Sequence, residues 1–241
     1  MKTVLITGGT KGIGKGIALE FLERGYEVVI NYCHDEKSAL ATQEEFNMQG
    51  YCPVLLRADV SDELQVKGMF REFFGIYDKL DVLVNNAGVS LVRVIQDTSQ
   101  TDWNKVFSVN VNGVFNCCRA VADRMIGCGG GSIINIASIW GEVGASCEVA
   151  YSASKGAVIA FTKALAKELA PSKVRVNCVS PGVIDTEMNS HLTGEEMENL
   201  IEEIPIGRIG TPADVAKACA YLAEAEYVTG EVVSVGGGFG K

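Results

Sequence analysis

The sequence predicts a single α/β domain, built as a doubly wound parallel sheet of about seven strands with helices on both faces. Three observations carry this prediction. Short apolar runs alternate with longer helical patterns, a glycine-rich turn joins the first such run to the first helix, and no linker, repeat or low-complexity segment interrupts the 241 residues. Strands separated by helices form βαβ units, which build parallel sheets covered on both sides. We therefore expect one domain over 1–241.

The expected strands are short runs rich in Val, Ile and Leu, a composition typical of strands buried on both faces. They cover residues 3–7, 27–32, 53–57, 81–85, 132–137, 174–179 and 231–235. The helical patterns lie between them, at 12–24, 36–49, 63–76, 102–126, 148–170 and 212–223.

One long segment, 186–211, interrupts the alternation and has acidic helical character at 195–203. A long insertion near strand ends is typical of a lid over a substrate, and a surface helical hairpin is the alternative.

The first strand leads into the turn Gly8-Gly9-Thr10-Lys11-Gly12-Ile13-Gly14. Glycines allow positive φ angles and let a backbone approach a pyrophosphate, while the start of the following helix supplies N–H groups and partial positive charge. The spacing Gly-x-x-x-Gly-x-Gly differs from the commoner Gly-x-Gly-x-x-Gly, so a simple tight connection is the competing interpretation. Together with Asn85-Asn86-Ala87-Gly88 after the fourth strand, the turn predicts a dinucleotide site.

A second group of side chains has the spacing of a proton-transfer site. Tyr151 and Lys155 are four residues apart in the expected helix 148–170, so they share one face, and the ammonium is expected to lower the phenol pKa from its usual ~10. Ser138 follows the strand 132–137 and points a hydroxyl to the same place. Tyr and Lys at this spacing also occur as plain surface pairs, but a tuned phenol acts as acid or base near neutrality. The set predicts carbonyl reduction.

These motifs in combination resemble the short-chain dehydrogenase/reductase family, and the resemblance runs from end to end of the chain. The matching elements are the glycine turn Thr7–Gly14, Asn85–Gly88, Asn110 in 103–110, the Ser138, Tyr151 and Lys155 set, and Ser180–Thr186. The resemblance implies a Rossmann fold, hydride transfer from a nicotinamide cofactor, and the catalytic set Asn110, Ser138, Tyr151 and Lys155. In that set Tyr151 protonates the alkoxide, Ser138 donates to the same oxygen, Lys155 holds the cofactor ribose and Asn110 anchors a water.

The resemblance also assigns residues to the cofactor: Gly8, Thr10, Lys11, Gly12, Ile13, Gly14, Asn31, Tyr32, Asp59, Val60, Asn86, Ala87, Gly88, Tyr151, Lys155, Pro181, Gly182, Ile184 and Thr186. Tyr32 stands where NAD-preferring relatives carry Asp, and Lys11 adds positive charge, so NADP(H) is the expected cofactor. Lys11 as an ordinary solvated lysine and Asp59 as a helix N-cap are the alternatives.

The substrate is open between two kinds of ketone. Residues 181–188 and 204–208 are similar to bacterial 3-oxoacyl-[acyl-carrier-protein] reductases, whereas 138–149 resembles the elongation factor P 5-aminopentanone reductases. Glu142 and Glu148 would suit the amine of an aminoketone on elongation factor P. The carrier-linked substrate is slightly favoured, because that similarity is broader. The glycines at 127–131 and Gly236 depart from the carrier-protein reductases and leave a carrier docking site in doubt. Expected substrate contacts are Trp140, Cys147, Glu148 and Met188.

The alternative to an enzyme is a non-catalytic protein that binds a dinucleotide and senses redox state. Such a sensor can lose its active tyrosine, whereas this chain keeps Asn110, Ser138, Tyr151 and Lys155. The sequence therefore favours an enzyme.

Composition limits the partners. The chain has 30 Asp and Glu against 21 Lys and Arg, a formal net charge of −9, which disfavours nucleic acid. No uncharged apolar stretch is long enough for a membrane, and the first strand starts at once after Met1-Lys2, so we expect a cytoplasmic protein. The 8 cysteines contain no CxxC pair and only 2 histidines accompany them, so no metal site is expected. Family analogy suggests a homotetramer or homodimer.

Overall fold

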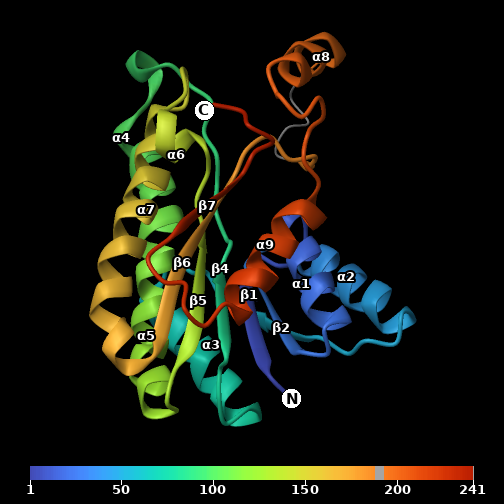
Figure 1. The fold of residues 1–241 in the computed structure, drawn as a ribbon, viewed down its shortest axis with the longest axis vertical. Coiled ribbons are helices and arrows are strands. Elements are labelled where there is room, and N and C mark those ends of the chain that lie inside the picture. Colours follow the sequence, from blue (N-terminus) through green and yellow to red (C-terminus); the bar gives the residue numbers. More distant parts are fainter. Residues whose placement is uncertain (188–192, 241) are drawn as a thin grey trace.

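The computed structural model describes residues 1–187 and 193–240, and it confirms the doubly wound α/β fold (Figure 1). The strands are β1 (Thr3–Thr7), β2 (Glu27–Tyr32), β3 (Val54–Arg57), β4 (Val82–Asn85), β5 (Gly131–Ile136), β6 (Val174–Pro181) and β7 (Val232–Val235). The α-helices are α1 (Gly12–Glu23), α2 (Glu36–Met48), α3 (Glu63–Ile76), α4 (Gln100–Phe107), α5 (Gly113–Gly127), α6 (Trp140–Val143), α7 (Val149–Leu169), α8 (Gly194–Glu202) and α9 (Pro212–Glu224).

The sheet has seven parallel strands in the order β3-β2-β1-β4-β5-β6-β7. The chain winds outward from β1 to β3, returns to β4 beside β1, and then winds outward the other way. Ligand crevices in such sheets form at the carboxyl ends of the strands where the winding reverses, here between β1 and β4. The topology therefore brings the glycine turn after β1 close to residues 86–88 after β4.

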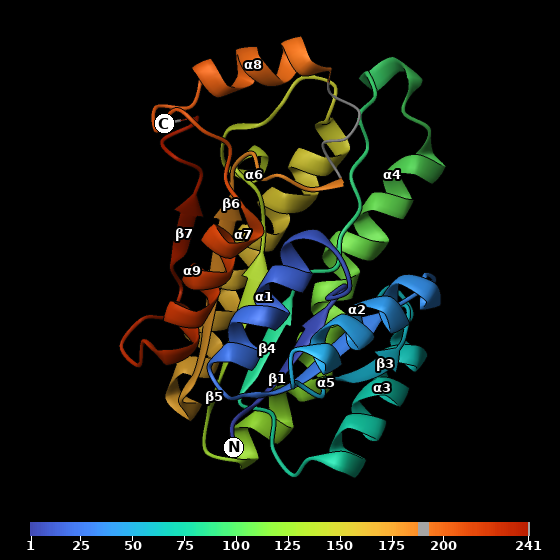
Figure 2. The same cartoon turned by 90° about the vertical axis from the view of Figure 1, so that its right-hand side faces the viewer.

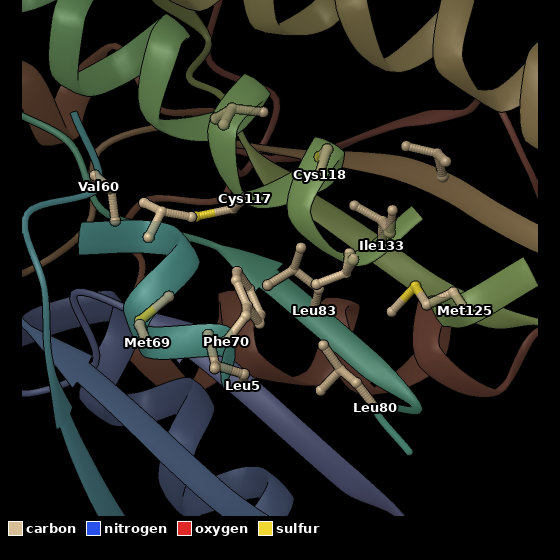
Figure 3. Close-up of a cluster of buried hydrophobic side chains, with 14 of the residues drawn as sticks. Leu5, Val60, Met69, Phe70, Leu80, Leu83, Cys117, Cys118, Met125 and Ile133 are labelled. Atoms are coloured by element: carbon tan, nitrogen blue, oxygen red, sulfur yellow. The ribbon is translucent and has the colours of Figure 1, made fainter. Parts of the chain in front are cut away.

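Helices cover both faces of the sheet, as Figures 1 and 2 show. Successive strand residues point to opposite faces, so Leu5 packs under α3 and α5 while Val4 and Ile6 pack under α1 and α9. Figure 3 shows Met69 and Phe70 of α3 and Cys117 and Cys118 of α5 gathered around the strand residues Leu5, Leu83 and Ile133. Each large side chain that is fully buried here contributes about 1.5–3 kcal/mol to stability.

The predicted helix 102–126 is wrong in detail. Two α-helices, α4 and α5, occupy this segment, and the π-helical turn Ser108–Asn112 joins them. An apolar repeat does not distinguish a wider turn from an α-helical one, and π-helical turns occur mostly at functional sites. Asn110 lies in this turn. The short helix α6, directly after Ser138, was also not predicted.

A buried chain of amides fastens α7 to the sheet. The Asn85 Nδ2 group donates to Asn135 Oδ1 at 2.8 Å, and Asn135 Nδ2 donates to the Thr162 hydroxyl at 2.9 Å. Thr162 in turn donates to the Val158 carbonyl at 2.8 Å, within α7. Because buried polar groups are costly to leave unpaired, this chain holds α7 against β5 and links that strand to β4.

The segment 186–211, predicted as a lid, contains α8, which lies apart from the main helical layers in Figure 2. Thr193 and Glu196 form a capping box at its start. A bridge between Ile184, just before the segment, and Gly210, near its end, brings the two ends close together. Among the residues that the structure describes, no helix combines the length and apolar character needed to cross a membrane.

Candidate active site

A cavity of about 970 Å³ opens at the carboxyl edge of the sheet. Its wall is formed by the glycine turn, by residues that follow β2, β3, β4, β5 and β6, and by α7. The predicted site residues on this wall are Gly8, Lys11, Gly12, Ile13, Gly14, Asn31, Asp59, Val60, Asn86, Ala87, Gly88, Ser138, Trp140, Glu148, Tyr151, Lys155, Pro181, Gly182, Ile184 and Thr186.

The glycine turn is tightly packed at one end of the cavity. Gly8 and Gly12 have φ angles of 61° and 47°, in the left-handed region that favours glycine. A Cβ on Gly14 would lie 2.3 Å from the Gly8 carbonyl oxygen and 2.5 Å from Asn86 Nδ2. No side chain caps the start of α1, and no acidic residue lies in its first turn. Its N-terminal N–H groups and dipole thus suit a phosphate, so the residues present fit a dinucleotide.

Asparagine side chains hold the loops of this end together. Asn86 Nδ2 donates to the carbonyls of Thr7 and Gly8, both at 3.0 Å, and the Thr7 hydroxyl accepts from Asn86 N at 3.0 Å. Asn31 Nδ2 donates to the Ala58 carbonyl at 3.0 Å. Asn31 and Asn86 therefore fix the cavity wall through hydrogen bonds across neighbouring strands.

Tyr151 and Lys155 lie one turn apart on α7, and only 8% and 4% of their surfaces are exposed. Lys155 Nζ donates to the Ile136 carbonyl at the end of β5 at 2.9 Å, and lies 5.6 Å from the centroid of the Tyr151 ring. Ser138, two residues beyond Ile136, is also buried. The carboxyl end of β5 and the first turns of α7 therefore bring a hydroxyl, a phenol and an amine together.

The predicted lowering of the tyrosine pKa is wrong for this structure. Burial raises the Tyr151 pKa to about 12, because desolvation disfavours the phenolate more than a hydrogen bond with Ser138 favours it. Burial also lowers the pKa of Lys155 to about 8. Spacing on a helix predicts proximity, but it does not report the loss of solvent, which decides both shifts here. Tyr151 is therefore protonated at neutral pH.

Asn110, predicted as catalytic, does not lie on the cavity wall and is 1% exposed. Its Nδ2 group donates to the Val89 carbonyl at 2.9 Å and to the Ser154 hydroxyl at 3.0 Å, and its Oδ1 accepts from Val89 N at 2.8 Å. Ser154 lies between Tyr151 and Lys155 in sequence. In this structure Asn110 thus joins the loop after β4 to the helix that carries both side chains.

Three further predicted residues also lie off the cavity wall. Thr10 faces α2, where its carbonyl accepts from the Thr42 hydroxyl at 2.9 Å. Tyr32 is half-buried at the end of β2, and the wall continues with Cys33 instead. Cys147 has a φ of 62°, a left-handed conformation that sequence spacing does not predict. The predicted contact Met188 lies outside the described residues.

The structure adds wall residues that sequence reasoning missed. Many of them adjoin a predicted motif, within one to four positions before or after it, so the sequence neighbours of each motif are the signal for them. Lys105, Ser108, Val109 and Leu200 come instead from other helical segments. The added residues are Cys33, His34, Ala58, Ser61, Val89, Ser90, Val92, Lys105, Ser108, Val109, Ile136, Ala137, Val183, Glu187 and Leu200.

Comparisons with known proteins agree with this geometry. The family described as "Enoyl-(Acyl carrier protein) reductase" matches residues 8–240. The 3-oxoacyl-[acyl-carrier-protein] reductases FabG of Staphylococcus aureus and Chlamydia pneumoniae are 38% and 39% identical over 239 residues. These matches cover 98% of this chain, with 97% of the first relative and 96% of the second.

Solved structures are also closely similar. A 3-oxoacyl-[acyl-carrier protein] reductase from Brucella melitensis superposes with a TM-score of 0.93 at 35% identity, covering 99% of this chain and 91% of that one. A putative gluconate dehydrogenase from Agrobacterium tumefaciens superposes with a TM-score of 0.95 at 29% identity, over 98% and 95% of the two chains.

The buried amine generates a prediction about stability. Because the Lys155 pKa falls from 10.5 to about 8 on folding, the unfolded chain binds more protons between these values, and folding at lower pH must accommodate a buried charge. Lys155→Met should therefore raise the free energy of unfolding at pH 7 by about 1–3 kcal/mol. This range already subtracts about 1 kcal/mol for the hydrogen bond that the substitution removes. The difference should shrink as the pH rises from 8 to 10.5.

Denaturant unfolding at several pH values measures this difference. Lys163→Met, at an exposed lysine of the same helix, is the matched control and should show no such pH-dependent gain. A wild-type protein more stable than Lys155→Met at pH 7 would contradict the account.

Proposed function

The chain belongs to the short-chain dehydrogenase/reductase family, and we propose that it reduces a 3-oxoacyl thioester to the 3-hydroxy product with NADPH. At the coarser level it is an oxidoreductase that acts on a CH–OH or C=O group. The observation that carries the proposal is the buried Tyr151 phenol, beside Ser138 and Lys155, on the wall of a cavity that begins at the glycine turn.

In this proposal the chain's own residues handle a proton. A bound nicotinamide dinucleotide supplies hydride. Tyr151 gives its phenolic proton to the carbonyl oxygen as that oxygen gains charge, and Ser138 donates a hydrogen bond to the same atom. The Lys155 ammonium, 5.6 Å from the ring centroid, stabilises the phenolate that remains. Reduction suits this site because its resting state holds the proton that the product needs.

The preference for NADPH over NADH rests on charge at the adenosine end. Lys11 lies on the cavity wall, where we expect its ammonium to attract a ribose 2′-phosphate. Lys11 Nζ also pairs with an Asp35 carboxylate oxygen at 2.7 Å. The hydrogen bond with Asp35 is the main cause that raises the Lys11 pKa. Asp35 partly offsets this positive charge, so we expect a preference rather than exclusion of NADH.

The thioester substrate is supported by the relatives' names and by apolar residues at the far end of the cavity. Trp140, Val183 and Leu200 line this end and also pack on the small buried cluster of Ile139, Ile204 and Phe239. Glu148 on the same wall is the feature that suits an aminoketone instead, and Ser90 donates to its Oε2 at 3.3 Å. Glu142 accepts from the Ser234 hydroxyl at 2.9 Å and is absent from the wall.

We place this activity in the cytoplasm, in a homotetramer or homodimer. All 8 cysteines are free thiols, as expected for a reducing compartment. On α5, Phe115 and Ile126 are 44% and 39% exposed, and both would be covered by a second subunit packed on this helix.

A substrate panel tests the proposed function. Oxidation of NADPH and of NADH is followed with an acetoacetyl thioester, free or carrier-linked, and with elongation factor P bearing an aminoketone. We expect the highest kcat/KM with the thioester, and a preference of about tenfold or more for NADPH, which corresponds to about 1.4 kcal/mol. Activity on the aminoketone alone would contradict the proposed substrate, and equal use of both dinucleotides would contradict the proposed cofactor.

The proton-donor role predicts the effect of Tyr151→Phe. Removing the phenolic hydroxyl should lower turnover by about 10²–10⁴-fold, because proton transfer then has no positioned donor. The dissociation constant of the dinucleotide, measured by fluorescence, should change little. Tyr227→Phe, at a fully exposed tyrosine, is the control and should keep normal turnover. Undiminished turnover in Tyr151→Phe would remove this residue from the mechanism.

A further inference from the structure

A group of possible metal ligands lies where β2 and β3 end. These strands pair in parallel with Tyr32 opposite Arg57, and Ala58 N donates to the Tyr32 carbonyl at 2.9 Å just beyond. The residues that follow each strand therefore leave the sheet side by side. Cys33 and His34 come from one strand and Asp59 from the other, and all three line the cavity.

The ligand atoms of these residues are close to the spacing that a metal requires. Cys33 Sγ lies 3.4 Å from His34 Nε2, and the three ligand atoms all lie within 4.8 Å of one another. Bonds of about 2.3 Å to sulfur and 2.0–2.1 Å to nitrogen put two tetrahedral zinc ligands about 3.5 Å apart. The sulfur and nitrogen already meet this distance, and the exposed His34 ring is free to adjust toward the carboxylate.

Neighbouring groups hold the ligands in place. The Asp59 Oδ1 atom accepts from Ser61 N at 2.9 Å and from the Ser61 hydroxyl at 2.7 Å. Arg57 Nε donates to the Cys33 carbonyl at 3.1 Å. Hydrogen bonds of this kind orient metal-binding carboxylates in known sites. The pocket therefore presents a carboxylate, a thiol and an imidazole on a supported backbone.

We infer that Cys33, His34 and Asp59 form a binding site for Zn²⁺ at the adenosine end of the cavity, and that Zn²⁺ and the dinucleotide exclude one another. Sulfur and nitrogen donors favour Zn²⁺ over Mg²⁺ or Ca²⁺, which prefer oxygen alone. Binding displaces the Cys33 thiol proton to solvent and leaves one coordination position for water. Mutual exclusion rests on the proposed cofactor orientation, whereas metal binding does not.

Zinc binding to the full-length, reduced protein tests the site directly. Zn²⁺ is titrated against a chromophoric chelator, with Mg²⁺ as the comparison ion. We expect one Zn²⁺ per chain, with affinity reduced at least about tenfold in Cys33→Ser and in His34→Ala, a change of about 1.4 kcal/mol. Cys52→Ser and Cys128→Ser remove exposed thiols outside the cavity and should leave affinity unchanged.

Circular dichroism and thermal melting establish that each variant is folded. If Cys33→Ser or His34→Ala does not fold, Asp59→Asn replaces it in the zinc titration. Co²⁺ gives an independent signature, because a thiolate-to-cobalt charge-transfer band should appear in the wild type and vanish in Cys33→Ser. Zinc affinity that survives both Cys33→Ser and His34→Ala, or that falls equally in Cys52→Ser, would overturn the site.

Competition is measured separately, by titrating NADPH fluorescence at fixed Zn²⁺ concentrations. The apparent dissociation constant of NADPH should rise linearly with free Zn²⁺, from its zinc-free value, and return to that value with a chelator. Stoichiometric Zn²⁺ binding that leaves NADPH affinity unchanged would overturn mutual exclusion while keeping the metal site. Neither result depends on which ketone is the substrate, so failure here is distinct from failure of the proposed reaction.

Discussion

The burial of Tyr151 and Lys155 on the first turns of α7 is the constraint on which the site depends. Loss of solvent raises the tyrosine pKa to about 12 and lowers that of the lysine to about 8, so the phenol keeps its proton and the amine holds its proton weakly. Such an arrangement is costly to fold. The Ile136 carbonyl accepts from Lys155, and the amide chain through Asn135 fastens α7 against the sheet. The fold thus separates the pKa values of two groups that would have similar pKa values in water.

Parallel strand order explains why different parts of the cavity carry different chemical groups. Between β1 and β4 the winding reverses, and the glycine turn there offers backbone N–H groups to a phosphate. Where β2 and β3 end, the same edge presents Cys33, His34 and Asp59, while Ser138 after β5 and Tyr151 and Lys155 of α7 line another part of the cavity. One edge of one sheet therefore carries the glycine turn, the Cys33, His34 and Asp59 group, and the buried Tyr151 and Lys155 pair.

The strands, the glycine turn and the nearness of Tyr151 to Lys155 could be predicted from the sequence, because each depends on local pattern: apolar runs, glycine spacing and helical periodicity. The direction of the tyrosine pKa shift could not, since it depends on how much solvent the surrounding elements exclude. The π-helical turn at Asn110 keeps an apolar repeat like that of an α-helix. Cys147 has a left-handed backbone and lies off the cavity wall, and spacing in the sequence reports neither. Cys33 and Asp59 meet only because the register of β2 and β3 aligns them.

The protonation state of Tyr151 in the free protein tests this account most directly. Carbon-13 NMR of ζ-labelled tyrosine follows each phenol with pH, and the Tyr151 signal is the one missing from the spectrum of Tyr151→Phe. We expect that signal to remain in the protonated form up to about pH 10, because burial outweighs the hydrogen bond with Ser138. Deprotonation with a pKa below about 9 would mean that the Lys155 charge dominates the site, and would contradict the account.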